Sequence, residues 1–447
     1  MLPTSLLNHI RIGVGALFVG VCAGAWAEES AYKAAYIGLE PWLEDIPEAP
    51  RFDGISGRVL CGYQGWFRCQ GDGSGLGWRH YGTSIKGQGK QFRPGACSVD
   101  LWPDMSEYTE EERFDTPFRH ADGGVAQVFS SQHPKSVQRH FRWMADYGID
   151  GAFVQRFASI ARGGRDDYDD LAADNRKLTM CRQAANDAGV CWALMYDLSG
   201  VTPENMHRVV RDWKMLRQKM DLGNDPSYLH FNGRPLVAIW GGGFAGERRP
   251  RAKQVADLAR LIKHNPDWGG CSVMLGVPTG WRERERDCID DPDLEELFGL
   301  ADILSPWSVG RYHRPDQVRK HAMSYWRPDI VHAETSGAEY LPVVFPGFSW
   351  HNHMHGEAEL DLIPRLGGKF LWKQFLEAKI AGADAVYVAM FDEMDEGTAI
   401  FKCSSDPPVG DSPFVSFGEL PSDHYLWLCG EAGKLLREEL PVRSTVK

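Results

Sequence analysis

Four carboxylates fall within five positions near the end of the chain, at Asp392, Glu393, Asp395 and Glu396. They come directly after the apolar run 385–390, which is typical of a buried strand. Like charges this close perturb one another's pKa values and cost stability, which indicates a functional site. One carboxyl that donates a proton beside another that accepts one is the arrangement that breaks glycosidic bonds. Because Glu393 and Glu396 are spaced i, i+3, a helical turn after the strand would place both in one cleft.

Short apolar runs alternate with helical patterns along the chain, as in the βα units of a parallel sheet. Eight such runs predict strands at 59–63, 151–154, 192–196, 236–240, 272–277, 303–307, 341–345 and 385–390. Helices are predicted between them, at 137–147, 171–188, 209–220, 251–264, 294–300, 315–326, 370–381 and 425–439. We therefore predict an α/β fold, a (β/α)8 TIM barrel with a long irregular insertion after the first strand, at 65–130. The Gly-rich segment 71–77 is not followed by a helix start, so it does not indicate a phosphate-binding loop.

In such a barrel the carboxyl ends of all strands face one mouth, so the residues that follow each strand are candidates for the site. Aromatic planes there suit stacking on sugars, and fixed polar groups suit sugar hydroxyls. The 16 Trp of the chain agree with a glycan as partner, although many aromatic rings simply fill a core. The predicted substrate-binding residues are Tyr63, Trp66, Gln155, Arg156, Tyr196, Asp197, Trp240, Trp307, Arg311, Trp350, His351 and Asp392.

Residues 1–27 have the pattern of a secretory signal peptide, with Arg11 before an apolar run and Ala25-Trp26-Ala27 as a cleavage site. A lipoprotein signal at Cys22 ranks second, because Val21 stands where that signal needs a small residue. We expect a secreted or periplasmic monomer with an N-terminal lead-in at 28–50 and one catalytic domain at 51–447. The net charge of -12 becomes -13 when the +1 of Arg11 is removed, and this argues against nucleic acid and membrane surfaces as partners.

The ten cysteines lose Cys22 with the signal, and the remaining nine are an odd number. Cys191 and Cys271 begin apolar strands and are expected to be buried thiols. Cys69 and Cys97 flank the Gly-rich insertion, and they are the pair that we predict to form a disulfide.

Two motifs leave other chemistry open. The acidic group could be a solvated loop or a cation site, but its position after the last of eight strands favours catalysis. His351, His353 and His355 alternate as metal ligands can, yet no other His-rich segment follows a strand to complete a site. We therefore expect no metal and no cofactor, and no Gly-x-Ser-x-Gly nucleophile elbow is found.

Several segments together resemble the glycoside hydrolase family 71/99-like group. They are Cys61-Gly62-Tyr63-Gln64-Gly65-Trp66, Asp100-Leu101-Trp102-Pro103-Asp104-Met105, Met195-Tyr196-Asp197-Leu198-Ser199-Gly200, 344–350 and 391–400. The related family 99 of endo-acting α-mannosidases carries Asn-Glu-Trp-His-Glu-Gly-Thr after its last barrel strand. The resemblance implies that Glu393 is a base acting on the substrate's 2-hydroxyl and that Glu396 is the general acid. Asp392, Met394 and Asp395 replace Asn, Trp and His, so the resemblance extends to the glutamate pair and not to mannose specificity.

The sequence thus predicts a secreted glycoside hydrolase with Glu396 as general acid and Glu393 as base or nucleophile. Asp392 and Asp395 would raise the pKa of the member that must stay protonated. The alternatives are a glycan-binding barrel without catalysis and a metal-dependent hydrolase that uses the acidic group or the His cluster.

Overall fold

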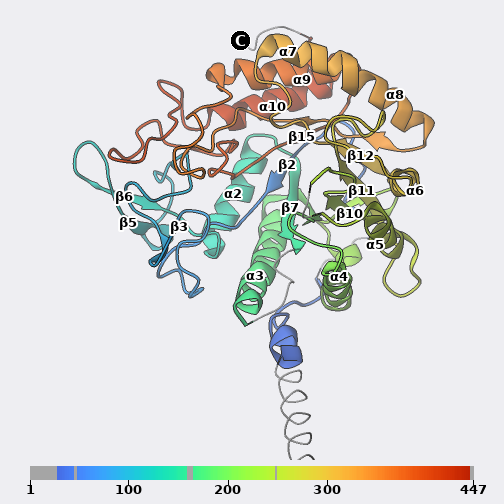
Figure 1. The fold of residues 1–447 in the computed structure, drawn as a ribbon, viewed down its shortest axis with the longest axis horizontal. Coiled ribbons are helices and arrows are strands. Elements are labelled where there is room, and N and C mark those ends of the chain that lie inside the picture. Colours follow the sequence, from blue (N-terminus) through green and yellow to red (C-terminus); the bar gives the residue numbers. More distant parts are fainter. Residues whose placement is uncertain (1–27, 45–47, 159–164, 247–248, 443–447) are drawn as a thin grey trace, which may run out of the picture.

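The computed structural model describes residues 28–44, 48–158, 165–246 and 249–442, and the predicted signal peptide lies outside these ranges. A ring of parallel strands forms the centre, and helices pack around it (Figure 1). No helix in the described part of the chain is both long and apolar enough to cross a bilayer.

Each of the eight predicted strands is present. They are β2 (Val59–Tyr63), β7 (Gly151–Phe157), β8 (Cys191–Asp197), β10 (Arg234–Trp240), β11 (Ser272–Val277), β12 (Ile303–Pro306), β13 (Glu339–Tyr340) with β14 (Val343–Val344), and β15 (Val386–Val388). Every neighbouring pair along this path is parallel. The strands are apolar and buried almost throughout, as parallel strands covered on both faces must be.

The seventh strand closes the ring in two pieces. β13 pairs with β12 and β14 pairs with β15, with Leu341 and Pro342 between the pieces. Leu341 N donates to Leu304 O at 2.9 Å, and Pro342 O accepts from Tyr387 N at 2.9 Å. Pro342 has no N–H to give, so the ladder is interrupted there while the barrel still closes. The predicted (β/α)8 barrel is confirmed.

The predicted helices are also present, with shifted ends. They are α2 (Pro134–Asp146), α3 (Arg165–Ala188), α4 (Met206–Met220), α5 (Ala252–His264), α6 (Leu294–Gly299), α7 (Pro315–His321), α9 (Lys369–Ala381) and α10 (His424–Leu436). The helix predicted at 315–326 instead continues from α7 through the π-helical segment Ala322–Trp326 into α8 (Arg327–Thr335). The apolar stripe of α4 is buried as predicted, at Val209, Trp213, Leu216 and Met220.

Most of the insertion after β2 has no regular secondary structure, as predicted, but the segment is folded. It contains two antiparallel hairpins, β3 (Thr83–Ile85) with β4 (Gly89–Gln91) and β5 (Phe114–Arg119) with β6 (Val125–Val128). It lies beside the barrel, at the left of Figure 1. Its own aromatic cluster holds it together, since Phe92 and Trp102 rings stack at 5.8 Å and both contact Phe118.

Two predictions outside the barrel have different outcomes. The nine described cysteines are all buried free thiols, so the Cys69–Cys97 disulfide is wrong. Cys69 Sγ instead donates to Phe129 O, at 3.1 Å. The lead-in starts with helical residues 28–34, and it buries Tyr32 and Tyr36 against the barrel's outer layer, where Tyr36 donates to Asp212.

Candidate active site

A cavity of about 360 Å³ lies at the carboxyl ends of the barrel strands. Residues at or just after the ends of β2, β7, β8, β10, β12 and β15 line it: Gln64, Trp66, Gln155, Phe157, Met195, Asp197, Ser199, Trp240, Trp307, Met390, Glu393 and Glu396. Its volume and its mixture of indole rings, amides and carboxylates are those of a site for a small polar ligand with apolar faces.

The segment after β15 brings the two glutamates into this cavity. Phe391 N donates to Gly62 O at 2.8 Å, which continues the strand, and residues 394–397 then form a turn. Gly397 allows this turn, because its φ is +61° and a Cβ there would lie 2.7 Å from Ser349 N. The turn after the strand therefore has the form that places positions i and i+3 on one side, and both glutamates line the cavity.

Glu393 is held by two side-chain donors. Gln64 Nε2 donates to one carboxyl oxygen at 2.9 Å, and Thr398 Oγ1 donates to the other at 2.8 Å. Burial and the charges of Glu396 and Asp395 raise the pKa of Glu393 well above its usual range, while these two hydrogen bonds oppose the rise.

Glu396 is partly exposed, and no side chain of the described residues donates a hydrogen bond to its carboxyl group. Burial, with the charges of Asp395 and Asp197, raises the pKa of Glu396 to about 7. Glu393 and Glu396 perturb each other, so the pair as a whole binds a proton near neutral pH.

The two aspartates of the acidic group lie behind the cavity. Asp392 is fully buried and accepts from Gln64 N and Gly65 N, each at 2.8 Å, so it fixes the segment after β2. Burial raises the pKa of Asp392 to about 6. Asp395 accepts from, or donates to, His80 Nδ1 at 3.0 Å, and burial raises the pKa of Asp395 to about 7. Asp392 was predicted to bind substrate, but its carboxyl group instead accepts hydrogen bonds from two backbone N–H groups.

Asp100, from the insertion, connects the segments that form the rim. Its carboxylate accepts from His351 N at 2.7 Å and Asn352 N at 2.8 Å, and its own N–H donates to Met394 O at 3.0 Å. Ser349 N donates to Glu396 O at 2.9 Å. The segments after the first, seventh and eighth barrel strands are thereby joined around the glutamates.

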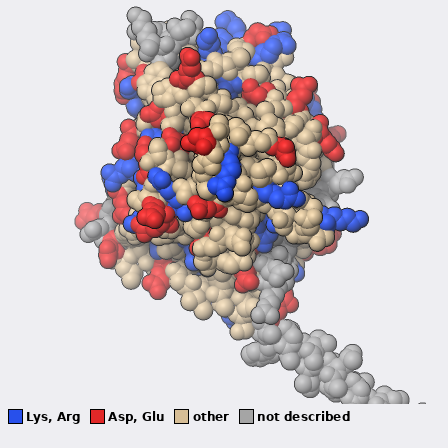
Figure 2. Space-filling model, turned by 90° about the vertical axis from the view of Figure 1, so that its left-hand side faces the viewer, with Lys and Arg blue, Asp and Glu red and all other residues tan. Residues whose placement is uncertain are grey.

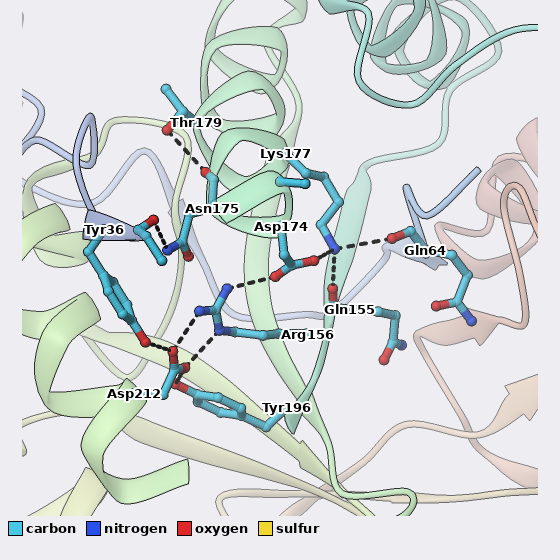
Figure 3. Close-up of polar contacts among 12 residues, drawn as sticks. Tyr36, Gln64, Gln155, Arg156, Asp174, Asn175, Lys177, Thr179, Tyr196 and Asp212 are labelled. Carbon is cyan, nitrogen blue, oxygen red and sulfur yellow. Dashed lines mark hydrogen bonds and ion pairs between the residues drawn. The ribbon is translucent and has the colours of Figure 1, made fainter. Parts of the chain in front are cut away.

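Three predicted substrate-binding residues point out of the barrel and are not part of the site. Tyr63 OH contacts His140 Nδ1 on α2 at 3.0 Å and is fully buried. Arg156 lies between Asp174 of α3 and Asp212 of α4, and Tyr196 OH donates to the same Asp212 at 2.7 Å (Figure 3). Neighbours along a strand face opposite sides, so the inward residues are Gln155 and Asp197.

Three other predicted residues lie near the rim without lining the cavity. Arg311 is paired with Asp287 at 2.6 Å. Trp350 packs on Phe348, with ring centroids 5.3 Å apart. His351 Nδ1 contacts Ala358 O at 2.7 Å. Within the described ranges, no group of three or more His, Cys, Asp or Glu is arranged to hold a metal ion.

The structure brings together Trp66, Gln155, Asp197, Trp240, Trp307, Glu393 and Glu396 from the predicted set. The prediction missed Gln64, Phe157, Met195, Ser199 and Met390, which also line the cavity. Strand alternation is the signal that could have found two of them, because Phe157 follows Gln155 by two positions and Met195 precedes Asp197 by two.

A buried ion network supports the cavity from outside the barrel (Figure 3). Lys177 of α3 donates to Gln155 O at 2.6 Å and to Gln64 O at 3.2 Å, and it pairs with Asp174 at 2.5 Å. Gln64 and Gln155 both line the cavity, so one ammonium group fixes the backbone at two of its walls.

No family model matches the chain, and no curated protein matches it. Among solved structures, it is similar to the GH99 endo-alpha-mannosidase from Bacteroides thetaiotaomicron, with a TM-score of 0.61 and 16% identity over 86% of this chain and 99% of that one. A second structure of that enzyme, in complex with BIS-TRIS-propane, has a TM-score of 0.57 and 15% identity over the same shares. A glycoside hydrolase-like protein has a TM-score of 0.51 and 13% identity over 90% of this chain and 98% of that one. At these identities the likeness shows a shared fold.

Proposed function

We propose that the protein is a glycoside hydrolase in which Glu393 and Glu396 form the catalytic pair. The observation that carries this proposal is that both glutamates line one cavity with Trp66, Trp240 and Trp307. Indole rings bind the apolar faces of sugars, and two carboxyls with raised pKa values supply an acid and a base. The likeness in fold to a GH99 endo-alpha-mannosidase supports the same reaction class.

The hydrogen bonds support an assignment of roles within the pair. Glu393 accepts from Gln64 and Thr398, and both donors favour its ionised form. No side chain of the described residues donates to the Glu396 carboxyl, so nothing comparable favours its ionised form, and we assign the proton to Glu396. Glu396 then protonates the glycosidic oxygen as the general acid. Glu393 takes the proton of the substrate's 2-hydroxyl while that oxygen attacks the anomeric carbon and the glycosidic bond breaks, or its carboxylate attacks the anomeric carbon itself. Water then opens the anhydro sugar or the glycosyl ester, which completes the hydrolysis.

The proposal is tested by incubating purified protein with a panel of oligosaccharides and following products by NMR. We expect Glu393→Gln and Glu396→Gln each to lower kcat by about 10²–10⁴-fold, the range for loss of general acid–base catalysis. Glu359→Gln, which changes an exposed glutamate outside the cavity, is the matched control and should keep full activity.

Unchanged turnover in either variant would remove that residue from the mechanism. Binding of a glycan with no product in any reaction would instead indicate a glycan-binding barrel without catalysis.

We also propose that the protein is exported, on the sequence pattern of residues 1–27. Sequencing the N-terminus of the mature protein tests this proposal, and a first residue near Glu28 is the expected result.

A further inference from the structure

A second cavity, of about 260 Å³, adjoins the cavity that contains Glu393 and Glu396. We call the first cavity the acidic cavity and the second the basic annex. The two cavities share Gln64, Trp66 and Phe157 as lining residues. The Trp66 ring stacks on His80 with centroids 3.8 Å apart and lies 5.1 Å from the Phe157 ring, so aromatic rings lie where the two cavities meet. A ligand longer than one sugar could therefore occupy both cavities.

The charged residues of the annex are Arg68, Arg79, Lys90, Lys177, Asp170 and Asp174. They come from two elements. Arg68, Arg79 and Lys90 belong to the insertion, and Lys90 lies in strand β4 of its first hairpin. The other three belong to α3.

The α3 side of the annex is electrically balanced. Lys177 pairs with Asp174, and Asp174 also pairs with Arg156 at 2.6 Å. Arg156 in turn pairs with Asp212 at 2.6 Å. Two cations and two carboxylates thus neutralise each other behind the wall of the annex (Figure 3).

The insertion side has more positive than negative charge. Asp170 is shared by Arg68, at 2.9 Å, and Arg79, at 3.1 Å. The Lys90 side chain makes no hydrogen bond or ion pair with any residue that the structure describes, although the charges of Asp170 and Asp395 act on it. The lining residues together comprise four cations and two carboxylates, an excess of two positive charges in a chain whose net charge is -12.

The two guanidinium groups also have donors to spare. Arg68 is 7% exposed, and the Nε atoms of Arg68 and Arg79 have no hydrogen-bond partner among the described residues. A buried, partly used guanidinium is costly, and an anion with several oxygen atoms satisfies it well. The face that carries the insertion has acidic and basic side chains interspersed (Figure 2), so the excess is a property of the cavity and not of a broad basic surface.

We propose that the glycan bound by this protein carries an acidic group, a carboxylate or a sulfate ester. The annex binds this group through Lys90, Arg79 and Arg68, while a neighbouring sugar lies in the acidic cavity beside Glu393 and Glu396. This proposal rests on the proposed function in that the acidic group is taken to belong to a glycan. It adds a substrate class that the glutamate pair alone does not specify.

The test uses the full protein and three monosaccharide probes: glucuronate, glucose 6-sulfate and neutral glucose. Binding is measured by calorimetry at 50 mM and 500 mM NaCl for the wild type, Lys90→Gln and Lys86→Gln. Lys86 is an exposed lysine on the same hairpin that does not line the annex, so Lys86→Gln removes an equal charge as the matched control.

We expect an acidic probe to bind at least tenfold more tightly than glucose, and 500 mM NaCl to weaken that binding. Lys90→Gln should weaken binding of the acidic probe about tenfold, the effect of losing one charged contact, and Lys86→Gln should leave it unchanged. Preference for glucuronate assigns a carboxylate, and preference for glucose 6-sulfate assigns a sulfate ester.

Equal binding of all three probes, no saturable binding of either anion, or an unchanged affinity in Lys90→Gln would overturn the proposal. The outcome is independent of catalysis. Lys90-dependent anion binding without hydrolysis of any glycan would support the annex as an anion site and contradict the proposed function. Hydrolysis of neutral glycans without anion binding would support the proposed function and contradict the annex as an anion site.

Discussion

Glu396→Gln should stabilise the protein at alkaline pH while it removes activity. Burial and the charges of Asp395 and Asp197 raise the pKa of this carboxyl from 4.5 to about 7. The folded protein therefore binds a proton here more tightly than the unfolded chain does. Between about pH 4.5 and pH 7 the folded state is the more protonated one, so its stability falls as the pH rises.

The size of the effect follows from the two pKa values. Their difference, from 4.5 to about 7, corresponds to about 3 kcal/mol at ~1.36 kcal/mol per pKa unit. Glu393 and Asp395 share the repulsion, so we expect a gain of about 2 to 3 kcal/mol in the unfolding free energy of Glu396→Gln at pH 8. At pH 4.5 and below, the wild type carries a neutral carboxyl and the gain should be close to zero.

Urea unfolding of the wild type and Glu396→Gln at pH 4.5, 6 and 8 measures this dependence. Glu359→Gln serves again as the control, because that side chain is exposed and should give no pH-dependent gain. Equal stability of Glu396→Gln and the wild type at pH 8 would show that this carboxyl is well hydrated, and the electrostatic argument for its role as the acid would be refuted.

Four further results are expected. Thr398→Val removes a donor to the Glu393 carboxylate, so the acidic limb of the kcat/KM profile should move up by about one pH unit; an unmoved limb would mean that Glu393 is not the base. Asp212→Asn leaves Arg156 buried with a weakened partner and should lower the unfolding free energy by about 3 kcal/mol in urea, whereas a change below 1 kcal/mol would contradict a structural role for this ion pair. Dialysis against EDTA should leave glycan hydrolysis unchanged, since the proposed acid and base are protein carboxyls; lost activity restored by a divalent metal would favour the metal-dependent alternative. Adding dithiothreitol should not change the thermal midpoint, because the described cysteines are free thiols, and a drop would reveal a disulfide that the structure lacks.

The sequence was sufficient to predict the barrel because its signal is repeated. Eight apolar runs separated by helical patterns form few folds other than a (β/α)8 barrel. The acidic group was located for the same reason, since the carboxyl end of the last strand must face the mouth. The boundaries of β13 and β14 were not predictable from the apolar run 341–345, because the pairing of Glu339 and Tyr340 with β12 depends on tertiary contacts.

The errors at the site have a common physical origin. Tyr63, Arg156 and Tyr196 lie at strand ends, but their side chains face the helices. Side chains alternate along a strand, so a shift of one residue decides whether a side chain faces the cavity or the helix layer. The sequence pattern predicts the strands but not which of their residues face the cavity.

The insertion was harder still to predict. Its hairpin at 83–91 has a turn signal in Lys86-Gly87-Gln88-Gly89, but nothing local indicates that Lys90 lies beside Asp170 in one cavity. Asp100 shows the same limit, since its hydrogen-bond partners are about 250 positions away in the chain.

The contacts of Asp100 have a consequence for how proteins with this site can diversify. Backbone N–H groups of Ser349 and Asp100 fix the turn with Glu396, and the Asp100 carboxylate also fixes His351 and Asn352. A substitution of Asp100 therefore disturbs the segment beside that turn. The hairpin that bears Lys90 has no such constraint, because its strands pair chiefly with each other and much of it is exposed. Homologues should therefore differ first in this hairpin, where a substitution leaves the turn with Glu396 in place.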